Sequence, residues 1–222
     1  MSELRYGRAV PDTTVRAKVL DFLRQEIVEQ RFEPGQRLIE RELVEEIGVS
    51  RTTVREVLRQ LDAEGLVRTT PQRGAIVAVP TPGEAAELYE VRAALEALAA
   101  RRFVAHASDA QVRALRDAFE AIERVAVNGD IAAIVAAKDR FYDVLLAGSR
   151  SHAVAEILSE LQARVSLLRR TSLGRPGRAA RSLEEIRAIV EAVEARDAAG
   201  AARAAARHVE QAARAGLGAL RP

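Results

Sequence analysis

The sequence contains no cysteine. This absence excludes disulfide bonds, thiolate zinc sites and a cysteine nucleophile, and it is compatible with a reducing cytoplasm. Aromatic residues make up only 4% of the chain, so Leu, Val, Ile and Ala must supply most of the core. Such a core favours packed helices over a large sheet. A chain of 222 residues is long enough for one large domain or two small ones.

Long apolar runs are also absent. No segment approaches the roughly 18 consecutive apolar residues of a membrane span, and residues 1–10 lack the apolar centre of a signal peptide. We therefore expect a soluble cytoplasmic protein that does not bind membranes. The net charge is only +2, and the first 80 residues carry 13 basic and 13 acidic side chains. Any argument for nucleic-acid binding must therefore come from the positions of individual arginines.

After a tail of residues 1–12, the pattern predicts a small domain over residues 13–79. Apolar residues recur every three to four positions in three segments, as in amphipathic helices. Gly48 is placed to end the second helix, and Ser50 is placed to cap the third. β-prone residues then flank a turn, as in a hairpin. The expected helices are residues 13–30, 40–47 and 51–64, and the expected hairpin strands are residues 66–70 and 75–79.

A linker at residues 80–83, with the sequence Pro-Thr-Pro-Gly, marks a domain boundary. Every segment beyond it has a helical pattern, so residues 84–222 predict an all-helical domain. The fold class is therefore mainly α, with three helices and a β-hairpin followed by an all-α six-helix bundle. The expected helices of the second domain are residues 84–106, 109–127, 130–147, 152–172, 180–197 and 199–216.

The segment from Gly48 to Arg59 has the arrangement of a helix-turn-helix. A three-residue turn joins two short helices, and the second helix directs an apolar stripe inward. Its other face carries Thr52, Arg55 and Arg59. A recognition helix needs this arrangement, because its first residues enter the major groove, where arginine can bind guanine through two hydrogen bonds. The alternative is an ordinary three-helix module with a solvated arginine face.

The predicted hairpin favours the DNA-binding interpretation. Its tip carries Arg73 and Gly74, and glycine there would let the backbone come close to a duplex, as a wing does. Free backbone N–H groups and threonines at the start of the third helix could hold phosphates. The tight turn, the hairpin and the cluster of threonine and arginine occur together, which an ordinary three-helix module does not require.

The stretch RELVEEIGVSRTTVREVLRQLDAEGLVRTTPQRGAIV closely resembles the winged helix-turn-helix of the GntR family of bacterial regulators, over residues 13–79. The helical remainder resembles the FadR-like branch with its effector-binding FCD domain, and six helices suggest the VanR-like subgroup. The resemblance implies a homodimer on an inverted-repeat operator of double-stranded DNA, usually a repressor released by a metabolite. It implies DNA contacts from Arg41, Ser50, Arg51, Thr52, Thr53, Arg55, Arg73 and Gly74.

Lys138 is an unusual residue of the helical domain, because it shares a helix face with Ile134, Phe141 and Leu145. A lysine in an apolar stripe is costly unless its charge is paired or its stem snorkels to water. One interpretation is a snorkelling lysine. The other is a buried cation that awaits an anionic ligand.

Many FCD domains bind a divalent metal through an aspartate, a histidine four residues later and two further histidines. The matching positions here are Lys138, Tyr142, Ile186 and His208. Three of the four ligands are replaced, so we predict that the protein holds no metal and needs no cofactor. The resemblance suggests instead that the lysine supplies the positive charge of a pocket for a carboxylate or another anion. The predicted effector-binding residues are Arg92, Lys138, Tyr142, Arg164 and His208.

Two of these residues have other interpretations. Arg92 could form a surface ion pair with Glu96, and His208 could be a structural core histidine. The helical domain could also be a dimerisation platform that binds no ligand, or a catalytic domain. We do not expect an enzyme, because the sequence shows no nucleophile–base pairing, no phosphate-binding loop and no paired carboxylates within an apolar pocket.

Overall fold

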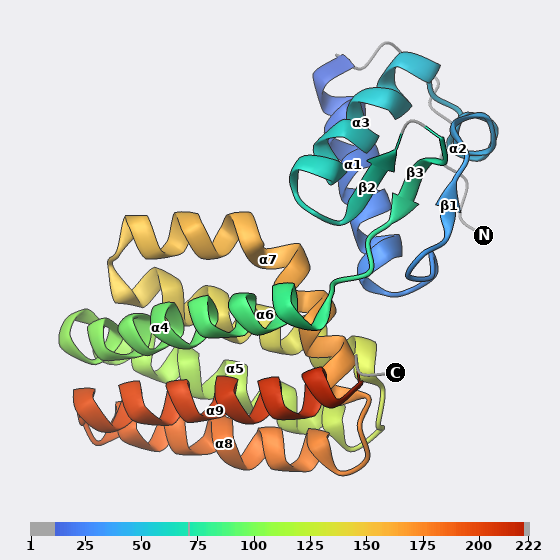
Figure 1. The fold of residues 1–222 in the computed structure, drawn as a ribbon. Helices are drawn as coiled ribbons and strands as arrows, with labels where there is room; N and C mark the ends of the chain where they lie inside the picture. The colour runs from blue at the N-terminus through green and yellow to red at the C-terminus, as the bar shows by residue number, and fades with distance from the viewer. Residues whose placement is uncertain (1–11, 71, 220–222) are drawn as a thin grey trace. The chain divides into compact units, whose positions relative to one another are not determined.

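The computed structural model describes residues 12–70 and 72–219. The predicted tail, residues 1–12, lies outside the described residues except for Asp12, where the first helix begins. The chain divides into two compact units between Val79 and Pro80 (Figure 1). Each unit has its own buried core. Among the described helices, none has both the length and the apolar run needed to cross a bilayer.

The N-terminal unit contains three helices and a small antiparallel sheet. The two hairpin strands were expected, whereas residues 37 and 38 form a third strand that pairs with the free edge of the second hairpin strand. A two-residue strand is too short to show an alternating pattern, so the sequence did not reveal its pairing. The elements are α1 (Asp12–Val28), β1 (Arg37–Leu38), α2 (Glu40–Ile47), α3 (Arg51–Ala63), β2 (Val67–Thr70) and β3 (Gly74–Val77).

Local sequence determines the turn between α2 and α3. Gly48 ends α2 in the left-handed conformation, with φ of 76°, which a side chain would strain. Ser50 caps α3 by accepting a hydrogen bond from the Thr53 backbone N–H at 3.1 Å. The apolar stripe of α3, which includes Val57 and Leu61, is buried. The exposed side of the helix is thereby held in a fixed orientation within this unit.

The C-terminal unit is a bundle of six helices, as expected. Its first helix begins at Pro82, so the predicted linker of residues 80–83 is too long by two residues. Thr81 and Glu84 form a capping box, and proline is tolerated in the first turn because its missing N–H needs no partner there. The helices are α4 (Pro82–His106), α5 (Asp109–Ala126), α6 (Ile131–Ser149), α7 (His152–Leu173), α8 (Arg178–Glu194) and α9 (Ala198–Ala219).

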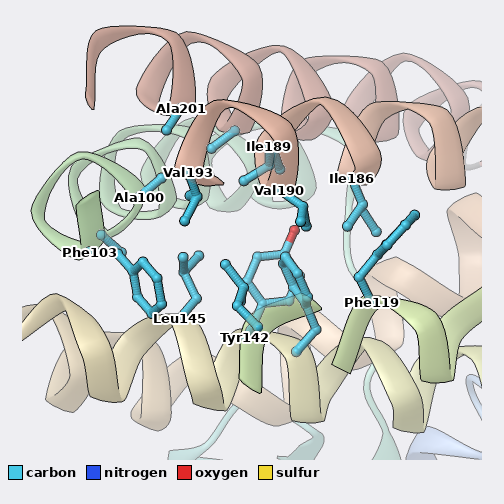
Figure 2. Close-up of a cluster of buried hydrophobic side chains, with 14 of the residues drawn as sticks. Ala100, Phe103, Phe119, Tyr142, Leu145, Ile186, Ile189, Val190, Val193 and Ala201 are labelled. Carbon is cyan, nitrogen blue, oxygen red and sulfur yellow. The ribbon is translucent and has the colours of Figure 1, made fainter. Parts of the chain in front are cut away.

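Phenylalanine and aliphatic side chains from several helices fill the centre of this bundle. Figure 2 shows Ile186 and Val190 of α8 directed toward Phe119 and Tyr142, which belong to α5 and α6. Phe103 of α4 packs in the same cluster. Alanines such as those of α9 let the helices approach closely, so this Ala-rich composition is compatible with a well-packed core. The bundle is therefore a rigid frame for any polar group buried within it.

Candidate functional sites

The start of α3 presents one set of predicted DNA-binding residues to solvent. Arg51, Thr52 and Arg55 are exposed, as is Arg41 at the start of α2. Thr53 behaves differently, because its side chain is only 6% exposed and its hydroxyl lies 2.8 Å from Ser50 Oγ. The Thr53 side chain is therefore part of the cap that shapes the turn, and the DNA contact expected of Thr53 stays a prediction.

Two of the exposed arginines form ion pairs within the unit. Arg55 Nε donates to Glu40 Oε2 at 2.8 Å, and the Arg55 side chain remains 60% exposed. Arg41 Nε lies 4.0 Å from Glu45 Oε1 on the surface of α2. Exposed pairs of this kind contribute only about 0–1 kcal/mol. A phosphate or a guanine edge could therefore replace either carboxylate at small cost.

The hairpin turn carries the predicted wing residues. Arg73 is exposed, and Gly74 has φ of 70°, which favours glycine. A Cβ atom at Gly74 would lie 4.0 Å from the guanidinium of Arg37, which belongs to β1. Sequence reasoning missed this additional exposed arginine at the wing, because only the pairing of Arg37 with Ile76 brings β1 beside the hairpin.

A second site is a cluster of buried polar side chains inside the C-terminal unit. Lys138 is 2% exposed, which rules out the snorkelling interpretation. Arg92 is fully buried, so its pair with Glu96 is not the surface pair considered above. Five helices contribute to this cluster: its buried members are Arg92 and Glu96 of α4, Lys138 and Tyr142 of α6, Ser166 and Arg169 of α7, Arg178 and Ser182 of α8, and His208 of α9.

Lys138 belongs to a chain of hydrogen bonds that connects Ser182, His208 and Glu185. Its Nζ donates to Ser182 Oγ at 2.8 Å and lies 3.3 Å from His208 Nε2. His208 Nδ1 lies 2.6 Å from Glu185 Oε2, and Arg178 Nη2 donates to the same oxygen at 2.7 Å. The carboxylate accepts, so Nδ1 carries the imidazole proton and Nε2 is left to accept from the lysine.

Burial controls the charge of this pair. It lowers the pKa of Lys138 well below its usual value, and the positive charges of Arg169 and Arg92 lower it further. Burial also lowers the pKa of His208, and the positive charge that Lys138 carries when it is protonated lowers it further. Desolvation and like charge act in the same direction on both groups, which favours their neutral forms.

On the α4 side of the cluster, Arg92 Nε donates to Glu96 Oε1 at 3.0 Å. Arg169 pairs with Asp139, and its guanidinium lies 4.1 Å from the centre of the Tyr142 ring. Ser166 Oγ also donates to Asp139, with its oxygens at 2.9 and 3.1 Å. Arg92 and Arg178 thus each pair with one carboxylate, whereas Arg169 pairs with Asp139 and also lies 3.7 Å from Glu96 Oε1 through its Nη2.

Several buried polar atoms of the cluster still have no hydrogen-bond partner among the described residues. Five are arginine nitrogens that can only donate. A buried donor without a partner costs about 1–3 kcal/mol, and native proteins contain few of them. Donor atoms therefore predominate among the buried polar atoms that have no partner in the described part of the chain. The atoms are Arg92 Nη1 and Nη2, Arg169 Nε, Arg178 Nε and Nη1, Glu96 Oε2 and Tyr142 Oη.

Sequence reasoning identified part of this site. Lys138 and His208 were expected together and are in contact. Arg164 is half-buried, and no contact joins it to the cluster in the part of the chain described; the α7 arginine inside the cluster is Arg169. Arg178 was missed, although it is followed by Ser182 and Glu185 at helical spacing, which places all three on one face of α8.

The donor set of this cluster does not fit a divalent metal. Of the four positions that the family comparison matches to ligands, Ile186 lies in the apolar core and only His208 is a common ligand. Both ring nitrogens of His208 already face Lys138 and Glu185. Within residues 12–70 and 72–219, no three His, Cys, Asp or Glu side chains are grouped so that they could hold an ion.

Two known protein families match this chain. The family described as bacterial regulatory proteins, gntR family, matches residues 15–77, and the FCD domain matches residues 87–211. Over 121 residues, the chain is 39% identical to an uncharacterised HTH-type transcriptional regulator of Agrobacterium vitis, covering 52% of this chain and 70% of that protein. Over 101 residues it is 32% identical to the HTH-type transcriptional repressor RspR of Escherichia coli, covering 46% and 44%.

Solved structures have the same fold. Escherichia coli McbR/YncC superposes with a TM-score of 0.77 at 22% identity, covering 89% of this chain and 94% of that one. A transcriptional regulator, GntR, from Rhodococcus sp. RHA1 superposes with a TM-score of 0.76 at 26% identity, covering 94% and 100%. Both units are therefore found together in proteins of known structure.

Proposed function

Since this chain belongs to the GntR family of bacterial transcriptional regulators and carries an FCD domain, we propose that it is a metabolite-responsive repressor. In this proposal a homodimer binds an inverted-repeat operator in the cytoplasm. A small anion binds the helical domain and changes the fit of the two DNA-binding domains to their half-sites. The anion acts only if it binds the two states of the protein with different affinity.

The DNA-binding part of the proposal rests on the exposed start of α3. Arg55 lies there on a helix whose other side is buried, and the side chain of its partner Glu40 is 36% exposed. Arg55→Ala should weaken operator binding by about 1–3 kcal/mol and relax the sequence preference. Fluorescence anisotropy titrations would measure both effects, and unchanged affinity would remove Arg55 from the interface.

Two matched variants sharpen this measurement. Glu40→Gln keeps the shape of the side chain but removes the carboxylate that holds Arg55 Nε, so it should strengthen operator binding by up to about 1 kcal/mol. Arg214→Ala removes one exposed positive charge from α9, in the C-terminal unit, and should leave affinity near that of the unaltered protein. Equal losses from Arg55→Ala and Arg214→Ala would show that only total charge matters.

The effector part of the proposal rests on the buried donors without partners, above all Arg92 Nη1 and Nη2. A ligand that binds only the folded protein raises its melting temperature. We therefore expect thermal-shift screening with mono- and dicarboxylates, 2-oxo acids and inorganic phosphate to find stabilising anions. No stabilisation by any of them at saturation would favour the second candidate function, a helical domain that only dimerises.

We also propose that this effector site works without a metal, with the buried arginines, and Lys138 whenever it is protonated, as the sources of positive charge. Elemental analysis of gently purified protein should then find no stoichiometric zinc, manganese or nickel. One bound ion per chain would contradict the proposal. We further propose that the protein has no enzymatic role, which fits its membership of a family of regulators.

A further inference from the structure

Lys138, His208 and Glu185 have the arrangement of an activated nucleophile. The lysine Nζ lies 3.3 Å from His208 Nε2, and Glu185 orients the imidazole through Nδ1 at 2.6 Å. Nucleophilic catalysis needs these parts: a nucleophile within reach of a base, and a third group that holds the base. The simple binding of an anion requires none of them. A fixed cation such as arginine would bind a carboxylate without any base beside it.

We propose that Lys138 captures an oxo acid as a reversible Schiff base, and that this covalent bond is how the protein recognises its effector. The inference rests on the proposed function, because it places the effector at the buried polar cluster. It adds the chemical class of the ligand, a carboxylate that also bears a ketone or aldehyde. It also adds a bond-forming step that the anion-binding proposal does not contain.

The step balances without an oxidant or reductant. The lone pair of Lys138 Nζ attacks the carbonyl carbon, and a C–N bond forms as the carbonyl π bond breaks. His208 Nε2 takes one proton from the nitrogen and gives it to the former carbonyl oxygen, which becomes a hydroxyl. His208 then carries the second N–H proton to that hydroxyl, which leaves as water while the C=N bond forms. One amine and one carbonyl thus give one imine and one water, and hydrolysis reverses the step.

The surroundings of Lys138 favour this chemistry. Only a neutral amine has the lone pair that attacks, and burial together with Arg169 and Arg92 lowers the pKa of Lys138. Lysines that act through Schiff bases are activated in the same way, by desolvation and by neighbouring cations. Each unit by which the pKa falls raises the neutral fraction at neutral pH about tenfold.

Arg92 supplies the place for the carboxylate of the oxo acid. Its Nε is occupied by Glu96, whereas Nη1 and Nη2, which share the outer edge of the guanidinium, are buried and without partners in the described part of the chain. That edge matches the two oxygens of a carboxylate. Arg92 and Arg169 share the carboxylate of Glu96. The Arg169 guanidinium lies over the ring of Tyr142, one helical turn from Lys138, so the carboxylate and the amine sites belong to one cluster.

The composition of the chain permits a direct test. Of its 34 lysine and arginine residues only two, Lys18 and Lys138, are lysines. Lys18 is exposed on α1, in the other unit, and serves as an internal control. The full chain is incubated with pyruvate or 2-oxoglutarate and sodium cyanoborohydride, which reduces an imine to a stable secondary amine. Peptide mass spectrometry then locates the adduct.

We expect the reduced adduct at Lys138 to form faster than at Lys18, by on the order of tenfold or more. Lys138→Arg keeps a long basic side chain but cannot form an imine, so its adduct at position 138 should disappear. An adduct that is absent from Lys138, or that forms equally fast at Lys18, would overturn the inference. Labelling is read from the unaltered protein, so a variant that fails to fold does not prevent this outcome.

Lactate and 2-hydroxyglutarate separate the inference from the proposed function. Each differs from pyruvate or 2-oxoglutarate only by a hydroxyl in place of the ketone. Stabilisation by the oxo acids with an adduct, and weaker stabilisation by the hydroxy acids, supports the Schiff base. Equal stabilisation by both classes without an adduct keeps the anion site and overturns the Schiff base. No stabilisation and no adduct would overturn both.

Discussion

Arg92 illustrates, at the scale of one residue, how a buried charge can be only half satisfied. Its Nε binds Glu96, but Nη1 and Nη2 have no partner among the described residues. Partial satisfaction costs stability, because buried donors lose their hydrogen bonds to water. Active and ligand-binding sites commonly carry that cost in exchange for a prepared contact.

Arg92→Lys should weaken anion binding by about tenfold or more, since losing a charge-assisted hydrogen bond costs roughly 1.5–3 kcal/mol. Lysine keeps the charge but cannot offer two parallel donors. Isothermal titration with the strongest anion from the thermal-shift screen measures the loss. Arg164→Lys is the matched control on α7, and it should bind that anion as the unaltered protein does. Equal effects of both substitutions would contradict the role given to Arg92.

Some residues of the buried polar cluster could be identified from the sequence, and others could not. Lys138 was identifiable because a lysine within an apolar stripe violates the pattern of its own helix. Arg178 and Glu185 could not be identified from the sequence, because each lies on a face of α8 that is partly polar. Only tertiary packing shows that this face is turned toward the inside of the bundle. A polar residue on a partly polar helix face carries no signal until the helix it packs against is known.

At the scale of elements, helix ends were predicted to within about three residues, because capping groups and glycines mark them locally. The capping box at Thr81 and Glu84 is such a signal, and the deviation there arose from reading Pro82 as linker when proline also fits a first helical turn. The strand β1, whose pairing was not predicted, differs from the helix ends because no local residue marks it. Its partner β3 is almost forty residues away, so its existence depends on tertiary pairing.

The packing of α4 against α6 gives a prediction at this scale. Gly148 of α6 lies against the ring of Phe103, and a Cβ atom there would overlap that buried ring. Gly148→Ala should therefore destabilise the C-terminal unit by about 1–3 kcal/mol. Gly83→Ala in the first turn of α4 is the control, because nothing lies within 4 Å of its Cβ position. Urea denaturation measures both, and a Gly148→Ala protein as stable as Gly83→Ala would refute the close contact.

At the scale of the whole molecule, the two units use charge in opposite ways. The first 80 residues have as many acidic as basic side chains, so their affinity for DNA must depend on where a few arginines lie. The C-terminal unit buries three arginines and a lysine against three carboxylates. When Lys138 and His208 are neutral, those charges balance. A protonated Lys138 leaves one positive charge in excess, which an anion would compensate.

This balance predicts how stability depends on pH. The pKa values of Lys138 and His208 are both lowered in the folded state, chiefly by burial. As pH falls, the unfolded chain takes up protons at the ordinary values, near 10.5 for lysine and 6.5 for histidine, while the folded protein does not. Falling pH therefore favours the unfolded state, by about 1.4 kcal/mol per pH unit for each such proton. Each group continues to reduce the stability of the folded state until the pH reaches the folded-state pKa of that group.

We expect the unfolding free energy of the C-terminal unit to decrease between pH 8 and pH 6, and more steeply below pH 6.5. Glu185 acts in the opposite direction, because burial raises its pKa: the folded protein takes up this proton above the ordinary value of 4.5, so its contribution rises as pH falls to about 4.5 and is constant in more acidic solutions. Lys138→Met should flatten the slope by about one proton, whereas Lys18→Met should not change it. Urea denaturation at a series of pH values measures these slopes. If the unfolding free energy depended on pH with the same slope in all three proteins, Lys138 would be charged in the folded state. A charged lysine could bind an anion. It could not act as a nucleophile without first losing its proton.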